Sequence, residues 1–134
     1  MNLTQFDNLD KTKLIVELME NPEEVGQTII HCSYVSKREY VNGGWVNIWP
    51  TTYLKSVADA ERLQLIHALD ISVAPAIDVF HRPGELKRFT LLFPGIPNYW
   101  DQFDFIEETA QSILGFSVKN MKRNNSGVYY IELL

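Results

Sequence analysis

The chain has 134 residues and a formal net charge of −5, and it contains a single cysteine. That length suits one domain covering residues 1–134, which is large enough to bury a core without a metal or disulfide staple, and one cysteine cannot form a disulfide framework. The scattered charges offer no broad basic face for nucleic acid, and no run of about twenty apolar residues predicts a membrane span.

The first segment, Met1–Lys13, is polar, and we expect it to be loosely held. It lacks the order of a secretory signal, in which a charged region precedes an apolar region and a small-residue cleavage site. The sequence as it stands therefore predicts a cytoplasmic protein. If a leader was removed, the alternative is the periplasm or the cell envelope.

Short apolar or alternating runs then follow one another, separated by Pro, Gly and Asn. A period of two with aromatic and β-branched residues is typical of half-buried strands, and seven to nine such runs with turn signals about every eight to twelve residues predict an all-β sandwich. We expect strands over Leu14–Met19, Gln27–Val35, Trp45–Trp49, Arg88–Pro94, Phe103–Glu108, Ser112–Lys119 and Gly127–Leu133. Shorter extended segments are expected over Tyr53–Leu54, Ile71–Pro75 and Ile77–Phe80. The one cysteine, Cys32, falls in such a run and is expected to be a buried, unreactive thiol.

Two periodicities compete in Ser56–Asp70. Apolar residues recur near helical spacing, and Ala, Glu, Leu and Gln favour helices. Leu63, Leu65 and His67 also alternate with Gln64 and Ile66, as successive side chains do on the two faces of a strand. The local pattern leaves helix and strand equally open.

The stretch Lys87–Glu108 holds two strands joined by a crossing, Gly95–Asp101, that begins just after Pro94 and contains Pro97. A tight hairpin uses two to five residues with Asn-Gly or Gly-Gly, which this crossing lacks. We expect it to connect one sheet to the other, or one sheet edge to another.

Five segments in order resemble a bacterial β-sandwich domain of unassigned function. They are Gly44–Leu54 (GWVNIWPTTYL), Ile71–Pro75 (ISVAP), Arg82–Glu85 (RPGE), Phe89–Pro97 (FTLLFPGIP) and Phe103–Glu107 (FDFIE). That domain occurs alone or ahead of thioredoxin-like domains in envelope proteins. The resemblance implies an immunoglobulin-like antiparallel β-sandwich of seven to nine short strands.

The same resemblance implies that Arg62–Leu69 is a strand and that Trp45 or Trp49 lies near the core. The sequence departs from the family pattern in having no export signal and no Cys-x-x-Cys partner domain. It also extends through Val128–Leu134, an added strand that would cover a sheet edge or pair with a partner, including a second copy of the chain in a homodimer.

The residues that chemistry would use are dispersed. The histidines His31, His67 and His81 are far apart, and no nucleophile lies on a recognisable sharp turn, so we expect neither a metal nor another cofactor. The densest acidic group lies in Asp101–Glu108. Paired carboxylates serve acid-base chemistry or bind calcium, but the favoured interpretation is a solvated strand face.

Aromatic side chains are more numerous than a core of this size requires, and Tyr99 and Trp100 fall in the crossing. Exposed aromatic loops mark surfaces that bind protein or sugar. We therefore expect a non-catalytic interaction or ligand-binding module, with Tyr99 and Trp100 as the contact surface and Arg82 and Glu107 as polar residues that fix the ligand. The competing interpretations are that Trp100 folds back onto the core, and that residues 99–108 serve a metal-dependent enzyme or a sugar-binding domain.

Overall fold

The computed structural model describes residues 15–22, 26–109 and 114–134. Residues 15–20 are helical, and the backbone N–H of Asn21 donates to the carbonyl of Glu17 at 3.1 Å. The prediction of a strand over Leu14–Met19 is therefore wrong, because Leu, Glu and Met favour helices when no partner strand competes. Leu14, the segment Met1–Lys13 with the prediction made for it, and the start of the predicted strand at Ser112 lie outside the described residues.

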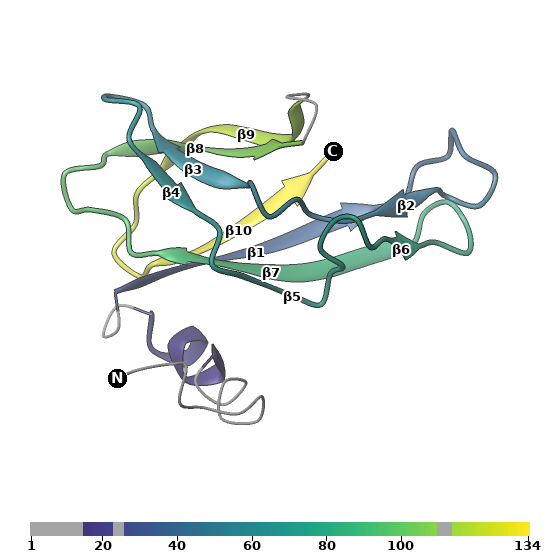
Figure 1. The fold of residues 1–134 in the computed structure, drawn as a ribbon, viewed down its shortest axis with the longest axis horizontal. Helices are drawn as coiled ribbons and strands as arrows, with labels where there is room; N and C mark the ends of the chain where they lie inside the picture. The colour runs from purple at the N-terminus through teal and green to yellow at the C-terminus, as the bar shows by residue number, and fades with distance from the viewer. Residues whose placement is uncertain (1–14, 23–25, 110–113) are drawn as a thin grey trace.

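Two four-stranded sheets form the body of the described protein, and they lie in separate layers (Figure 1). The first sheet has the order β10 (Val128–Leu133), β1 (Gln27–Val35), β7 (Leu86–Pro94) and β5 (His67–Leu69). The second has the order β4 (Arg62–Gln64), β3 (Tyr53–Ser56), β8 (Gln102–Glu108) and β9 (Leu114–Lys122). The all-β sandwich is thus confirmed, and the predicted bounds of β1 match the structure.

Two further strands, β2 (Trp45–Val46) and β6 (Asp78–Val79), form a separate two-stranded pair and extend one end of the sandwich (Figure 1). They account for only part of the predicted strand Trp45–Trp49. Beyond them, Ile48 makes an isolated parallel bridge with Val73. This end is therefore held by short pairings.

The strand order is that of an immunoglobulin-like sandwich. The strands β1, β7 and β5 take the positions of strands B, E and D, while β3, β8 and β9 take those of C, F and G, with β4 added beside C. The place of strand A belongs to the last strand, β10, which runs parallel to β1 with Ile29 opposite Val128. The added C-terminal strand thus covers the β1 edge, and β10 itself becomes an outer strand of that sheet.

The segment Ser56–Asp70 contains a turn at residues 57–59 followed by two short strands, so its helical alternative is wrong, and it is not one continuous strand either. The first of the two strands, β4, pairs with β3 in the second sheet, and the second, β5, pairs with β7 in the first. The switch occurs between two neighbouring residues, because the N–H of Leu65 donates to Thr52 and the N–H of Ile66 donates to Leu92. The polypeptide therefore crosses from one sheet to the other at this edge.

The core lies between the two sheets and consists of the inward residues of β1, β7, β3, β8 and β10. Aromatic pairs join the layers: the Phe93 and Phe105 ring centroids are 6.3 Å apart, and those of Phe103 and Tyr129 are 5.2 Å apart, both in edge-to-face geometry. Such pairs stabilise beyond their buried area by about 0.5–1.5 kcal/mol. The predicted crossing after Pro94 is confirmed as a sheet-to-sheet connection, since β7 and β8 belong to different layers.

Candidate functional site

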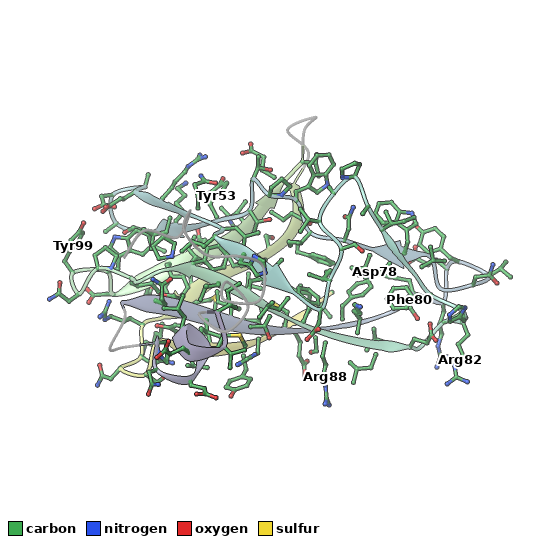
Figure 2. The ribbon with its side chains drawn as sticks, turned by 60° about the horizontal axis from the view of Figure 1, so that its bottom comes forward. Tyr53, Asp78, Phe80, Arg82, Arg88 and Tyr99 are labelled. Atoms are coloured by element: carbon green, nitrogen blue, oxygen red, sulfur yellow. The ribbon has the colours of Figure 1, made fainter. Side chains whose placement is uncertain are left out.

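The four residues predicted to form a binding surface do not lie together. Tyr99 and Arg82 are at opposite ends of the molecule (Figure 2), and Arg82 is exposed in the turn after β6. Trp100 and Glu107 are buried. The structure thus provides no single site built from this set.

Trp100 is a core residue, so the prediction that it is an exposed contact is wrong and the alternative, that it folds back onto the core, is confirmed. Its side chain is 1% exposed and its ring lies 6.5 Å from that of Phe103. The carboxylate of Glu61 accepts hydrogen bonds from Trp100 Nε1 at 3.2 Å and from the hydroxyl of Tyr99 at 2.7 Å. Tyr99 itself is 63% exposed, and its hydrogen bond to Glu61 raises the pKa of its hydroxyl.

Glu107 is a buried carboxylate, only 5% exposed, near the end of β8. Its Oε2 accepts a hydrogen bond from the backbone N–H of Trp49 at 3.0 Å, and its Oε1 accepts one from that of Phe116 at 3.1 Å. Burial raises the pKa of Glu107, and the two hydrogen bonds offset that rise only in part. The carboxylate therefore connects the segment before β3 to β9 through hydrogen bonds, although burial disfavours its charged form.

Gly115 leaves the space that this carboxylate occupies. A Cβ at Gly115 would overlap with Glu107 Oε1. A larger residue at this position would have to push the carboxylate aside and strain its bond to Phe116. The absence of a side chain at Gly115 therefore allows Glu107 to keep its hydrogen bond to Phe116.

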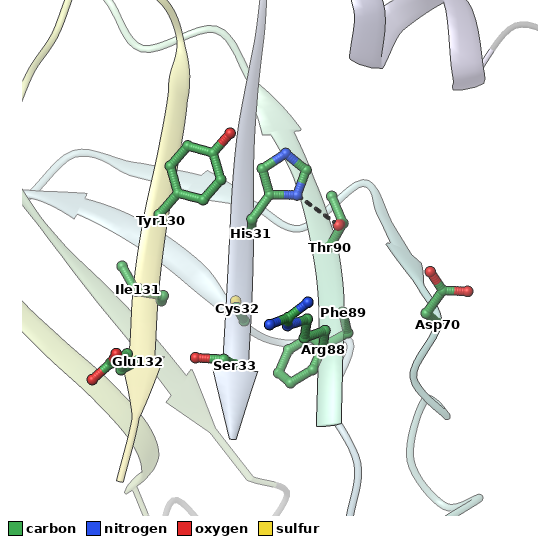
Figure 3. Close-up of a pocket in the computed structure, with 10 residues that line it drawn as sticks. All are labelled: His31, Cys32, Ser33, Asp70, Arg88, Phe89, Thr90, Tyr130, Ile131 and Glu132. Atoms are coloured by element: carbon green, nitrogen blue, oxygen red, sulfur yellow. Dashed lines mark hydrogen bonds between the residues drawn. The ribbon is translucent and has the colours of Figure 1, made fainter. Parts of the chain in front are cut away.

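A depression of about 760 Å³ lies on the outer face of the first sheet (Figure 3). His31 is central: its ring lies 5.0 Å from that of Tyr130, and its Nδ1 is 2.8 Å from the hydroxyl of Thr90. The next row across the sheet places Arg88 and Glu132 on either side of Ser33. Both signs of charge border this surface, as is common on the solvent face of a sheet.

This depression contains no activated nucleophile among the described residues. The thiol of Cys32 is buried as predicted, and burial raises its pKa to about 12, which disfavours the reactive thiolate. Ser33 has no hydrogen bond to His31, whose Nδ1 is committed to Thr90. The surface resembles a polar sheet face more than a catalytic centre.

The predicted acidic group Asp101–Glu108 does not converge on one point. Asp104 pairs with Lys119 at 3.6 Å and accepts the N–H of Asn120 at 2.8 Å, while Glu107 is held inside as described. Across the described part of the chain, no three His, Cys, Asp or Glu side chains are grouped so as to hold a metal ion. Apart from the buried Glu107, the acidic residues of this group agree with the interpretation of a solvent-facing strand surface.

A groove of about 280 Å³ lies where β1 and β8 end and β9 begins. Its walls combine rings with polar groups, and they include Trp45, Asn47, Trp49, Phe116, Lys37 and Glu107. Trp45 is 56% exposed and Trp49 is half-buried, so neither is the core tryptophan that the family resemblance implies. That place is taken by Trp100.

Large hydrophobic side chains are concentrated at this same end of the sandwich. More than half of the exposed ones in the described chain belong to residues 35–45 and 73–86, around β2 and β6: Val35, Tyr40, Val41, Trp45, Val73, Ile77, Val79 and Leu86. Trp45 and Val79 are cross-strand partners in the β2–β6 pair. We refer to these eight residues as the β2–β6 surface.

Sequence reasoning identified the surplus of aromatic residues, but it named Trp100, which is buried, and not Trp45, which is exposed. The alternation of Trp45, Asn47 and Trp49 already places their side chains on one side of an extended segment. In the described structure β2 pairs with one short strand, which leaves Trp45 exposed, and no local sequence pattern indicates this pairing. That fact depends on contacts between segments distant in sequence.

No protein-family model matches this chain, and no curated protein or solved structure matches it either. The resemblance to the bacterial sandwich domain therefore stays a prediction based on the five segments named above. Among the described residues, no helix has both the length and the apolar character needed to cross a membrane.

Proposed function

We propose that this protein is a non-catalytic binding module whose contact region is the β2–β6 surface and the adjoining groove. The observation that carries this proposal is the concentration of exposed apolar and aromatic side chains at that end, with Trp45 and Val79 paired on its two strands. Contiguous exposed apolar patches mark interaction sites, and aromatic residues are enriched in interfaces.

The opposite end does not offer a comparable surface among the residues that the structure describes. Tyr99 is exposed there, but its hydroxyl is bound to Glu61 and its neighbour Trp100 belongs to the core. A contact region centred on the crossing would rest on one tyrosine. The β2–β6 surface supplies several apolar side chains without any loss of core packing.

The test is affinity capture from native cell extract with three baits: the parent protein, the double variant Trp45→Ala/Val79→Ala, and Tyr99→Ala as a matched control at the other end. We expect a bound species that the parent and Tyr99→Ala retain and the double variant loses, while circular dichroism shows all three folded. Equal retention by all baits, or none by the folded parent, contradicts the proposal.

A further inference from the structure

The groove beside the β2–β6 surface carries both charges and rings, and this combination restricts the chemistry of its ligand. Glu107 contributes a carboxylate to one part of the groove wall, and Lys37 contributes an ammonium group to another. Within the described residues, Lys37 has no ion pair or hydrogen bond and Glu107 has no cationic partner. A ligand with a net charge of either sign would meet one attractive and one repulsive group.

The polar groups of the groove can both accept and donate hydrogen bonds. Each oxygen of Glu107 uses one of its lone pairs on a backbone N–H and keeps another for a ligand. Asn47 donates its Nδ2 to the carbonyl of Ala76 at 2.9 Å, which leaves its side-chain oxygen as an acceptor. Lys37 supplies donors only. Hydroxyl groups suit this set, because each can donate and accept.

The aromatic side chains supply flat apolar surfaces along the same groove. Trp45, Asn47 and Trp49 occupy alternate positions of an extended segment, which sets the α-carbons of the two tryptophans on the order of 13 Å apart. Phe116 also lines the groove, in edge-to-face contact with Tyr34 at 5.3 Å between ring centroids. The negative face of an indole ring attracts the weakly positive C–H groups of an apolar ligand face.

From these features we infer that the groove binds a neutral carbohydrate, an oligosaccharide of at least two rings, with sugar C–H faces on Trp45 and Trp49 and hydroxyls hydrogen-bonded to Glu107, Asn47 and Lys37. A sugar ring is a ligand class that presents apolar faces and dense hydroxyls without net charge. This inference rests on the proposed function and names the ligand class of the same end of the molecule.

The raised pKa of Glu107 agrees with this assignment. A buried carboxylate that costs stability is often kept because a ligand uses it, and perturbed ionisable groups concentrate at functional sites. The groove volume of about 280 Å³ lies just below the usual range for pockets that enclose their ligand, as expected when a chain of sugar rings lies partly in solvent.

The first test uses a glycan microarray probed with the fluorescently labelled parent, Trp45→Ala, Lys37→Met and Tyr99→Ala. Neutral oligosaccharides should bind the parent and Tyr99→Ala, and titration calorimetry with the best of them should show at least about a tenfold weaker Kd for Trp45→Ala. The oligosaccharide should also shift the parent's tryptophan emission. Binding unchanged in both Trp45→Ala and Lys37→Met would overturn the inference.

Charged probes separate the other ligand classes. We expect no saturable binding of tetramethylammonium chloride and weaker binding of sulfated or uronic acid glycans than of neutral ones. Preference for the ammonium ion, or for acidic glycans, would overturn the carbohydrate assignment. If the array stays blank while extract capture still depends on Trp45 and Val79, the inference fails and the proposed function stands; if both are blank, both fail.

Discussion

At one end of the sandwich the crossing Gly95–Asp101 turns Trp100 into the core, whereas at the other end the segment leading into β2 leaves Trp45 in solvent. The difference lies in the anchoring of the backbone. Arg123 Nη1 donates to the carbonyls of Ile96 at 2.9 Å and Pro97 at 2.6 Å, and Glu61 accepts the indole N–H of Trp100. The Trp45 indole has no hydrogen-bond partner among the described residues, and its strand pairs there with β6 alone.

The comparison teaches that an aromatic loop in a sandwich belongs to the core or to the surface according to what binds its backbone. The main-chain N–H of Trp100 donates to the carbonyl of Pro97 and its indole N–H donates to Glu61, so both donors of this buried residue are paired. Around Trp45, a two-residue strand provides little such support. The first end therefore contributes stability, whereas the second leaves the ring of Trp45 exposed.

The largest expected effect is that of Trp100→Ala. Removing a fully buried tryptophan should lower the free energy of unfolding by about 3–5 kcal/mol, because it leaves a cavity against Phe103. Urea denaturation followed by circular dichroism measures this. A loss below about 1 kcal/mol would mean that Trp100 is not packed as described and that the two ends do not differ.

Arg123→Ala should have the next largest effect. Its guanidinium bonds two carbonyls of the crossing, and hydrogen bonds to charged groups contribute about 1.5–3 kcal/mol. Arg88→Ala is the matched control, since Arg88 is exposed and unpaired among the described residues, and it should change stability by no more than about 0.5 kcal/mol. Equal losses in the two variants would show that the anchoring of the crossing does not depend on Arg123.

Replacing Glu107, which lines the groove, by Gln should have a smaller effect on the free energy of unfolding, and that effect should depend on pH. Because its pKa is raised in the folded protein, folding takes up a proton as the pH falls from neutrality toward the usual carboxyl value of 4.5. The stability that this group contributes is therefore present at low pH and is lost as the pH rises through the folded-state pKa. Against Glu107→Gln, which does not titrate, the parent should become relatively more stable on acidification.

The measurement is the difference in unfolding free energy between parent and Glu107→Gln at several pH values from neutral to the usual carboxyl value. Other carboxylates titrate alike in both proteins, so their contribution cancels. Asp104→Asn provides a control on the same strand, because Asp104 pairs with Lys119 and does not line the groove. A difference that stays constant with pH, or that moves against the parent, would contradict the raised pKa.

The sequence predicted those elements whose pattern is local. Gln27–Val35 alternates between buried and more exposed side chains from Ile30 onward and has its predicted bounds, while the helix at 15–20 was missed because its apolar run was taken for a strand. The sheet switch between Leu65 and Ile66 could not be predicted, since neighbouring N–H groups bond to opposite sheets. Local periodicity does not contain that information.

The candidate site was predicted less well than the fold, for a related reason. Burial of Trp100 depends on Glu61, which is 39 residues away, and exposure of Trp45 depends on how little pairs with β2. Composition indicated surplus aromatic residues, but only the tertiary contacts decide which of them remain outside.

The smallest expected effect on stability is that of Trp45→Ala, and it is the sharpest test of the comparison. A residue that is 56% exposed and makes one short cross-strand pairing should change the unfolding free energy by no more than about 0.5 kcal/mol. The same denaturation experiment as for Trp100→Ala measures it. A loss near that of Trp100→Ala would make Trp45 a structural residue. Unchanged stability together with lost binding would assign the exposed tryptophan to recognition, because the contacts that such a ring makes would then be with a ligand and not with the fold.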